Sequence, residues 1–131
     1  MIVGLGIDLL EICRMERTLA RSGDRFLARV FTAAERDACE ALGGGAARWA
    51  ARFAAKEAVM KALGTGWSRG VTWHDVEIVR APAGAPQVRL SGVARSVART
   101  RGAGVCHVTL THARSHAAAV AVLEAGGGAE E

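Results

Sequence analysis

The stretch from residue 46 to residue 63, AARWAARFAAKEAVMKAL, constrains the fold more than any other part of the sequence. Three glycines (43–45) precede it and Gly64 follows it, as is typical of a helix with defined ends. At about 100° per residue, one stripe of this helix contains Trp49, Phe53, Met60 and Leu63. We therefore expect one long helix over 46–63, with that stripe buried.

Several segments have the pattern of β-strands. The opening segment 2–7 alternates glycine with aliphatic residues, so we expect a strand whose glycine face is closely approached by another element. Segments 76–80 and 87–90 predict a hairpin around APAGAP. Segments 106–111 and 117–123 predict two further strands near the end of the chain.

Shorter helices are expected between these strands. One follows Asp8 through EICRMERTLAR and is expected to break at Ser22-Gly23-Asp24. Thr32 and Glu35 form a capping-box pattern before a second helix across AAERDACEAL, and a third is expected over 92–101. Because both periodicities occur in one small chain, we predict an α+β fold with a mainly antiparallel sheet packed against the long helix.

The length of 131 residues fits one compact domain, which we place at 1–124, followed by a disordered tail at 125–131. No apolar run approaches the roughly 18–20 residues that span a bilayer, and no secretory signal is visible, so no membrane association is expected. The three cysteines (Cys13, Cys39 and Cys106) follow no metal-binding pattern. Reduced thiols in a cytoplasmic protein are therefore expected.

The basic residues are distributed unevenly. The net charge of +4 favours an anionic partner, and nucleic acid, a phosphorylated metabolite and an acidic protein all fit it. Fifteen of the seventeen basic residues are arginine, and the two lysines, Lys56 and Lys61, lie on either side of Glu57. Lysine is a compact point charge and arginine a planar fork, so lysine suits a phosphate that moves during a reaction.

Two acidic residues have ordinary structural explanations when taken singly. Glu57 and Lys61 have the spacing of a helical salt bridge, and Asp8 has the place of a turn or cap residue. Together they suit a magnesium-bound phosphate, because Mg²⁺ prefers carboxylate, water and phosphate oxygens. The turn Gly64-Thr65-Gly66 is a further candidate for close approach to an anion.

Several segments carry a resemblance to a known family. GLGIDLLEI, RFLARVFTAAE, RFAAKEAVMKALGTG, the hairpin with GAPQVRLSG, and HVTLTHARSHAAAVAV spread over residues 1–123. Their order resembles holo-(acyl-carrier-protein) synthase, the short type of 4′-phosphopantetheinyl transferase. The resemblance implies one lobe of that fold and transfer of 4′-phosphopantetheine from coenzyme A to a serine of apo acyl carrier protein, releasing adenosine 3′,5′-bisphosphate.

The resemblance also implies roles for individual residues. Asp8 and Glu57 would be the Mg²⁺ ligands, and Lys61 would contact the transferring phosphate. Either Glu57 or a water on the metal would accept the serine proton, and the sequence favours neither. Catalytic roles are therefore expected for Glu57 and Lys61, which agrees with the need of phosphoryl transfer for positioning and charge neutralisation.

Further residues are weaker candidates. Candidates for coenzyme A binding, besides Lys61, are Arg52, Lys56, Gly64, Gly66 and His112. We place Lys56 further from the buried stripe than Lys61 and expect it near the helix surface. Trp67 stands where the resemblance implies a smaller aliphatic residue, so we expect the loop there to differ in shape from that of the family.

The resemblance implies an assembly as well as a site. Arg14, Arg17 and Arg21 share a helical face and would dock the acidic helix of the carrier protein. Short members of the family form homotrimers with active sites between subunits. The alternatives are a small basic nucleic-acid-binding domain and a Mg²⁺-dependent phosphohydrolase. The first is disfavoured because the acids would oppose a nucleic acid and stacking aromatic residues are scarce.

Overall fold

The long helix predicted from the sequence is the centre of the molecule. It is α3 (Ala46–Leu63) in the computed structural model, which describes residues 1–66 and 70–126. Gly45 precedes its first turn, and Gly64 ends it in the left-handed region at φ 81°, where its N–H donates to the carbonyls of Met60 and Lys61. The predicted helix and its glycine stop are both confirmed.

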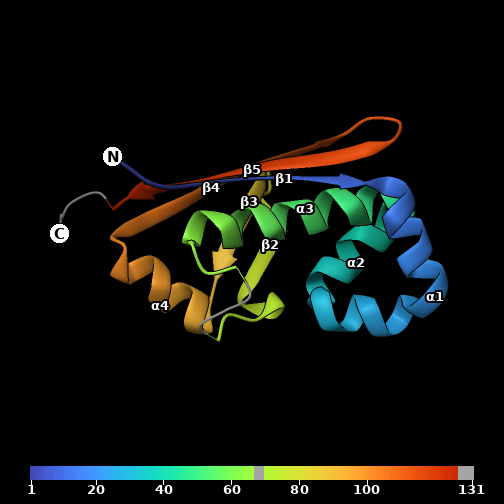
Figure 1. Ribbon diagram of the computed structural model, residues 1–131, viewed down its shortest axis with the longest axis horizontal. Helices are drawn as coiled ribbons and strands as arrows, with labels where there is room; N and C mark the ends of the chain where they lie inside the picture. The colour runs from blue at the N-terminus through green and yellow to red at the C-terminus, as the bar shows by residue number, and fades with distance from the viewer. Residues whose placement is uncertain (67–69, 127–131) are drawn as a thin grey trace.

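A three-stranded antiparallel sheet covers one side of α3 (Figure 1). Its strands, in spatial order, are β1 (Ile2–Glu11), β5 (His116–Ala125) and β4 (Ala103–His112). The predicted strand 2–7 is therefore too short, because pairing with β5 carries β1 on to Glu11. Asp8 consequently lies inside a strand, opposite Ala119, and is not a turn or cap residue.

Strand β1 lies directly on α3 through its glycines. A Cβ atom at Gly4 would collide with the carbonyl oxygen of Ala62, and one at Gly6 with that of Ala58. The expectation of a closely approached glycine face is confirmed. This contact brings the middle of β1 against the second half of α3 without intervening side chains.

Two helices pack at one end of α3 (Figure 1). Helix α1 (Ile12–Val30) consists of two helical segments joined at a kink: Ser22 has non-helical angles (φ −149°, ψ 39°), which confirms the expected break at Ser22-Gly23-Asp24. Helix α2 (Ala33–Ala41) begins with the predicted capping box, in which Thr32 and Glu35 each accept a hydrogen bond from the other's backbone N–H.

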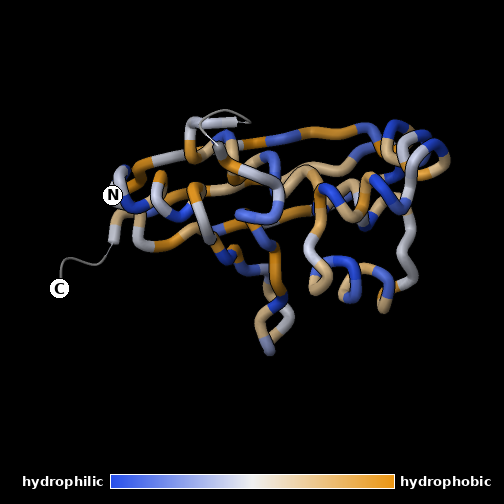
Figure 2. The backbone as a smooth tube through the Cα atoms, turned by 90° about the horizontal axis from the view of Figure 1, so that it is seen from below, coloured by the Kyte–Doolittle hydropathy of each residue, from blue (hydrophilic) through white to orange (hydrophobic). Residues whose placement is uncertain are grey.

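The remaining elements lie around the other faces of α3, and two of them, the second hairpin strand and the last helix, also contact β4 of the sheet (Figure 1). They are the short 3-10 helix η1 (Trp73–Asp75), the antiparallel strands β2 (Val76–Arg80) and β3 (Pro86–Leu90), and α4 (Gly92–Thr100). The hairpin and the last helix confirm the prediction to within one residue. The tip of the hairpin projects beyond the rest of the chain (Figure 2).

Because other elements pack around α3 from several directions, the buried residues of this helix cover more than the one predicted stripe. Twelve of its eighteen residues are buried, among them Arg52 and Lys56. Phe53 and Glu57 are half-buried, and Lys61 is exposed. The expected single buried stripe was therefore too narrow, and Phe53, which we placed in it, lies on the more open side.

The end of the sheet differs slightly from the predicted boundary. Strand β5 runs to Ala125, whose N–H donates to the carbonyl of Met1, and the N–H of Gly126 donates to Gly102. The ordered domain therefore includes the first two residues of the expected tail, and residues 127–131 lie outside the described part of the chain. Across the described residues, no helix is both long and apolar enough to span a bilayer.

Candidate active site

Strand β1 and helix α3 bring Asp8 and Lys61 into contact. The Nζ atom of Lys61 lies 3.0 Å from Oδ1 of Asp8 and 2.9 Å from the carbonyl oxygen of Ile7. The Asp8 side chain is largely buried, whereas half of the Lys61 side chain is exposed. These residues are 53 positions apart in the chain, and the close packing of β1 on α3 brings them together.

Glu57 completes this cluster from one turn earlier on α3. Burial raises the pKa of its carboxyl, the negative charge of Asp8 raises it further, and Lys61 lowers it in part. Because Lys61, one turn further along α3, contacts Asp8, the carboxyl of Glu57 lies on the same side of the helix and near that acid. The structure thus brings together the three residues that the sequence marked for chemistry: two carboxylates and one exposed cation.

The cluster fits a magnesium ion by its donor set. Two carboxylates on rigid elements offer hard oxygen ligands, and a cation would relieve the repulsion that Glu57 experiences from Asp8. Within the described residues, no group of three or more histidine, cysteine, aspartate or glutamate side chains is placed to hold a metal. Magnesium needs no such cage, because substrate phosphates and water complete its shell.

The two glycines of the turn after α3 have backbone N–H groups that are already hydrogen-bonded within the chain. The N–H groups of Gly64 and Gly66 both point back to the carbonyl of Met60, at 3.1 and 3.5 Å. Both glycines have positive φ, 81° and 54°, so the turn requires them for backbone reasons. Their role in coenzyme A binding stays a prediction that rests on the small size of glycine, not on these N–H groups.

Arg52 lies in a different region, on the β2 side of α3. It is buried, and its Nη1 donates to the carbonyl of Ile78 at 2.8 Å. Burial lowers the pKa of its guanidinium, and the nearby charge of Arg80 lowers it further. Arg52 lines a cavity of about 250 Å³ together with Arg48, Arg80 and His112.

This cavity, which we call the basic cavity, is separate from the group of Asp8, Glu57 and Lys61, which we call the acidic cluster. Arg52 contacts β2, whereas Lys61 contacts β1, and the lining of the cavity includes neither Asp8 nor Glu57 among the described residues. Arg52 and His112 were predicted to bind the same ligand, and the structure brings them together. It does not bring them to Asp8 within one chain.

Lys56 is not near the helix surface. Its side chain is fully buried, and its Nζ lies 2.7 Å from Oε1 of Glu35, whose side chain is also fully buried. The same Nζ lies 5.5 Å from the centre of the Phe31 ring. Burial lowers the pKa of Lys56, while Glu35 raises it in part. The expected coenzyme A contact is therefore wrong, because this lysine has no access to a ligand.

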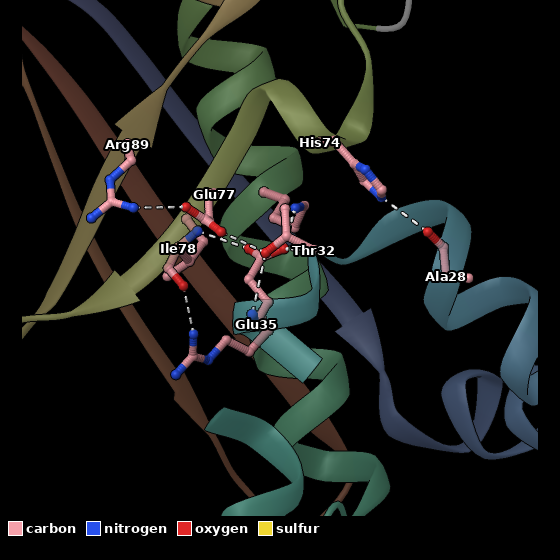
Figure 3. A network of polar contacts seen from close by, with 9 residues as sticks. Ala28, Thr32, Glu35, His74, Glu77, Ile78 and Arg89 are labelled. Atoms are coloured by element: carbon pink, nitrogen blue, oxygen red, sulfur yellow. Dashed lines mark hydrogen bonds and ion pairs between the residues drawn. The ribbon is translucent and has the colours of Figure 1, made fainter. Parts of the chain in front are cut away.

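Glu35 joins Lys56 to a wider network (Figure 3). Its second oxygen accepts the N–H of Ile78 at 2.8 Å, and Thr32 donates its hydroxyl to Glu77 at 2.6 Å. Sequence reasoning assigned Glu35 to the capping box and missed this second role. The available signal was the position of Lys56, which at about 100° per residue lies between Leu63 and Trp49 in the apolar stripe.

The three arginines expected to dock the carrier protein lie on α1. Arg14, Arg17 and Arg21 are exposed, while Met15 and Leu27 of the same helix are buried in the core. The predicted basic face is thus open to solvent, and docking remains a prediction. Trp67 lies outside the described residues.

Comparison with known proteins decides the family. The model of the 4′-phosphopantetheinyl transferase superfamily matches residues 4–121. This chain belongs to that superfamily. The curated holo-(acyl-carrier-protein) synthase of Solidesulfovibrio magneticus is 51% identical over 124 residues, which cover 95% of this chain and 99% of that protein.

Solved structures of transferases agree with this assignment. The Helicobacter pylori holo-(acyl-carrier-protein) synthase in complex with coenzyme A is 28% identical, with a TM-score of 0.81, and the match covers 92% of this chain and 99% of that one. The Bacillus anthracis enzyme in complex with CoA (3′,5′-ADP) is 35% identical, with a TM-score of 0.77, covering 95% and 98%. The predicted family and transferase fold are confirmed, and neither alternative function finds support.

Proposed function

We propose that this chain is a holo-(acyl-carrier-protein) synthase that transfers 4′-phosphopantetheine from coenzyme A to a serine of apo acyl carrier protein. The observation that carries the proposal is the meeting of Asp8, Glu57 and Lys61 at the contact of β1 and α3. Relatives with this name match the whole domain, and two similar structures contain coenzyme A or part of it. Adenosine 3′,5′-bisphosphate is the second product.

The acidic cluster would hold Mg²⁺ through the carboxylates of Asp8 and Glu57. When bound, the ion neutralises charge on the diphosphate of coenzyme A. Lys61 has an exposed side chain, so its ammonium can turn from Asp8 to the phosphate when the acid takes up the metal. There it stabilises negative charge on the oxygen that leaves with the adenosine bisphosphate.

The serine hydroxyl of the carrier must lose its proton to attack the phosphorus. Glu57 is the group of this chain that we propose as the acceptor. In the metal-free chain, burial and the charge of Asp8 raise the pKa of its carboxyl above that of an ordinary glutamate. The proton would pass to a carboxylate oxygen of Glu57.

We further propose that the chain assembles as a homotrimer through the outer face of its sheet. Leu5, Ile7 and Leu9 of β1 are 67%, 64% and 67% exposed on that face. Their partners on β5 are Val122, Val120 and Ala118, which are half-buried. A continuous exposed apolar surface on a sheet favours contact with another subunit, because burying it removes this area from water.

A trimer would also join the two halves of the ligand site. The basic cavity with Arg52 and His112 and the cluster with Asp8 and Lys61 are separate within one chain. If the cavity of one subunit faces the cluster of the next, coenzyme A spans both. The cavity then takes the 3′-phosphate of the adenosine part and the cluster takes the diphosphate.

The carrier protein would dock on the exposed arginine face of α1, where Arg14, Arg17 and Arg21 steer an acidic partner. Such an enzyme serves fatty acid biosynthesis and works in the cytoplasm. Both assignments belong to the proposal.

The test is to incubate the protein with coenzyme A, Mg²⁺ and apo acyl carrier protein and to weigh the carrier. We expect its mass to increase by one phosphopantetheine group, with release of adenosine 3′,5′-bisphosphate. Cleavage of coenzyme A without modification of the carrier would instead favour a phosphohydrolase. Retarded migration of DNA or RNA at physiological salt, with no transfer, would favour a nucleic-acid-binding domain.

A further inference from the structure

Arg101 joins the same two elements that carry the acidic cluster. It follows α4, and its guanidinium reaches across to three backbone carbonyls. Nη1 donates to Ala62 at 3.0 Å and to Leu63 at 2.7 Å, and Nη2 donates to Val3 at 2.5 Å. Ala62 and Leu63 end α3, and Val3 belongs to β1. One side chain therefore ties the end of the helix to the beginning of the strand.

Each of these carbonyls needs a partner that the regular structure does not supply. The last carbonyls of a helix have no partner within the helix and carry partial negative charge. Val3 falls at a shift of register between Ile2 and Gly4, where β1 has one residue without a counterpart on β5. The guanidinium of Arg101 can donate to the helix carbonyls through one nitrogen and to Val3 through the other. The single ammonium group of a lysine does not have two separated donor nitrogens.

Lys61 is a second residue whose hydrogen bonds hold β1 against α3. Its Nζ donates to the carbonyl of Ile7 and to Asp8. The proposed reaction breaks these hydrogen bonds of Lys61, because Lys61 must turn to the phosphate and Asp8 must bind the metal. The three hydrogen bonds of Arg101 involve backbone atoms away from the ligands and can persist through that change.

We propose that Arg101 is a positioning residue, which keeps Asp8 on β1 aligned with Glu57 on α3 while Lys61 is engaged with substrate. The inference rests on the proposed function. A Mg²⁺ ion demands near-ideal geometry from its ligands, so a small slip of strand against helix would weaken its binding. Arg101 thus acts on the metal site through the backbone and touches neither metal nor substrate.

The experiment measures metal binding directly, with Mn²⁺ as a spectroscopic substitute for Mg²⁺ in an oxygen-ligand site. Mn²⁺ affinity is determined by electron paramagnetic resonance for the wild type, Arg101→Met and Arg101→Lys, each with coenzyme A bound, so that its phosphates complete the shell and engage Lys61. We expect Arg101→Met to raise the dissociation constant about tenfold, the lower end of the effect of groups that support metal ligands. Arg101→Lys should recover part of this loss, because it keeps a donor but not the fork.

Two control variants separate positioning from general effects. Arg99→Met removes a neighbouring exposed arginine and should bind Mn²⁺ like the wild type. Val76→Ala opens a cavity in the core at β2 and should lower thermal stability without changing Mn²⁺ affinity. If Val76→Ala weakens Mn²⁺ binding as much as an equally destabilised Arg101→Met, the effect is global and the inference is wrong.

The outcomes also distinguish this inference from the proposed function. If the wild type transfers phosphopantetheine and Arg101→Met binds Mn²⁺ within twofold of it, the inference alone is overturned. If the wild type binds Mn²⁺ but modifies no carrier, the proposed function fails, and the weaker binding of Arg101→Met still supports the positioning role. Absence of Mn²⁺ binding in the wild type overturns the inference together with the metal site.

Discussion

The Nζ atom of Lys56 lies 2.7 Å from Oε1 of Glu35, and both side chains are fully buried. Removal of one partner leaves an uncompensated charge in the core, which typically costs about 3–5 kcal/mol. We therefore expect Lys56→Met to lower the free energy of unfolding by about that amount. Chemical denaturation of the purified variant measures it.

A double-mutant cycle checks that the cost arises from the pair. Lys56→Met/Glu35→Gln removes both charges while the glutamine keeps an acceptor for the N–H of Ile78. We expect the double variant to be more stable than Lys56→Met alone. Additive losses would mean that the two side chains do not interact in solution.

Lys61 has the opposite character, since it is exposed and contacts Asp8 at the site. Lys61→Arg keeps the charge, but a wide planar group cannot follow the phosphate as a point charge does. We expect kcat to fall about 10–100-fold with coenzyme A saturating, the scale of a small misplacement of reacting groups. Lys61→Met provides the comparison without charge. Full kcat for Lys61→Arg would show that any cation suffices at this position.

The sequence predicted the elements whose signals are local. The glycines around 46–63 mark the ends of α3, and Thr32 with Glu35 marks the start of α2. The alternating pattern of β2 also identified the hairpin almost to the residue. Such features depend on neighbouring residues and can be read from them.

The misplaced features depend on contacts between distant segments. Asp8 is typical of a turn, but pairing with Ala119 keeps it within β1. Lys56 was placed outward by a helical count that was wrong, and Glu35, 21 residues earlier, supplies the partner that allows a lysine to be buried there.

The basic face of α1 should control affinity for the carrier protein. Arg14→Glu is expected to raise the KM for the carrier roughly tenfold while the KM for coenzyme A stays unchanged, because exposed charges steer association. Added salt should reproduce this effect in the wild type. Arg95→Glu, at an exposed position of α4, is the matched control for the change in charge. Equal effects on both substrates would place Arg14 in the coenzyme A site.

Sites shared between subunits predict complementation. Asp8→Ala should inactivate the acidic cluster, and Arg48→Ala/His112→Ala should impair the basic cavity. In mixed trimers refolded from equal amounts, about a quarter of the sites would combine an intact cluster with an intact cavity. We therefore expect the mixture to exceed the activity of either parent. Activity no greater than the mean of the parents would contradict sites between subunits.

The most direct test of the central claim is the rate of holo-carrier formation against Mg²⁺ concentration, measured for the wild type, Asp8→Ala and Glu57→Ala. We expect the wild-type rate to rise with Mg²⁺ and to vanish with a chelator. Both variants should fold, as judged by circular dichroism, and should be at least about 100-fold slower at every Mg²⁺ concentration. Near-normal turnover of either variant at ordinary Mg²⁺ would contradict its assignment as a metal ligand.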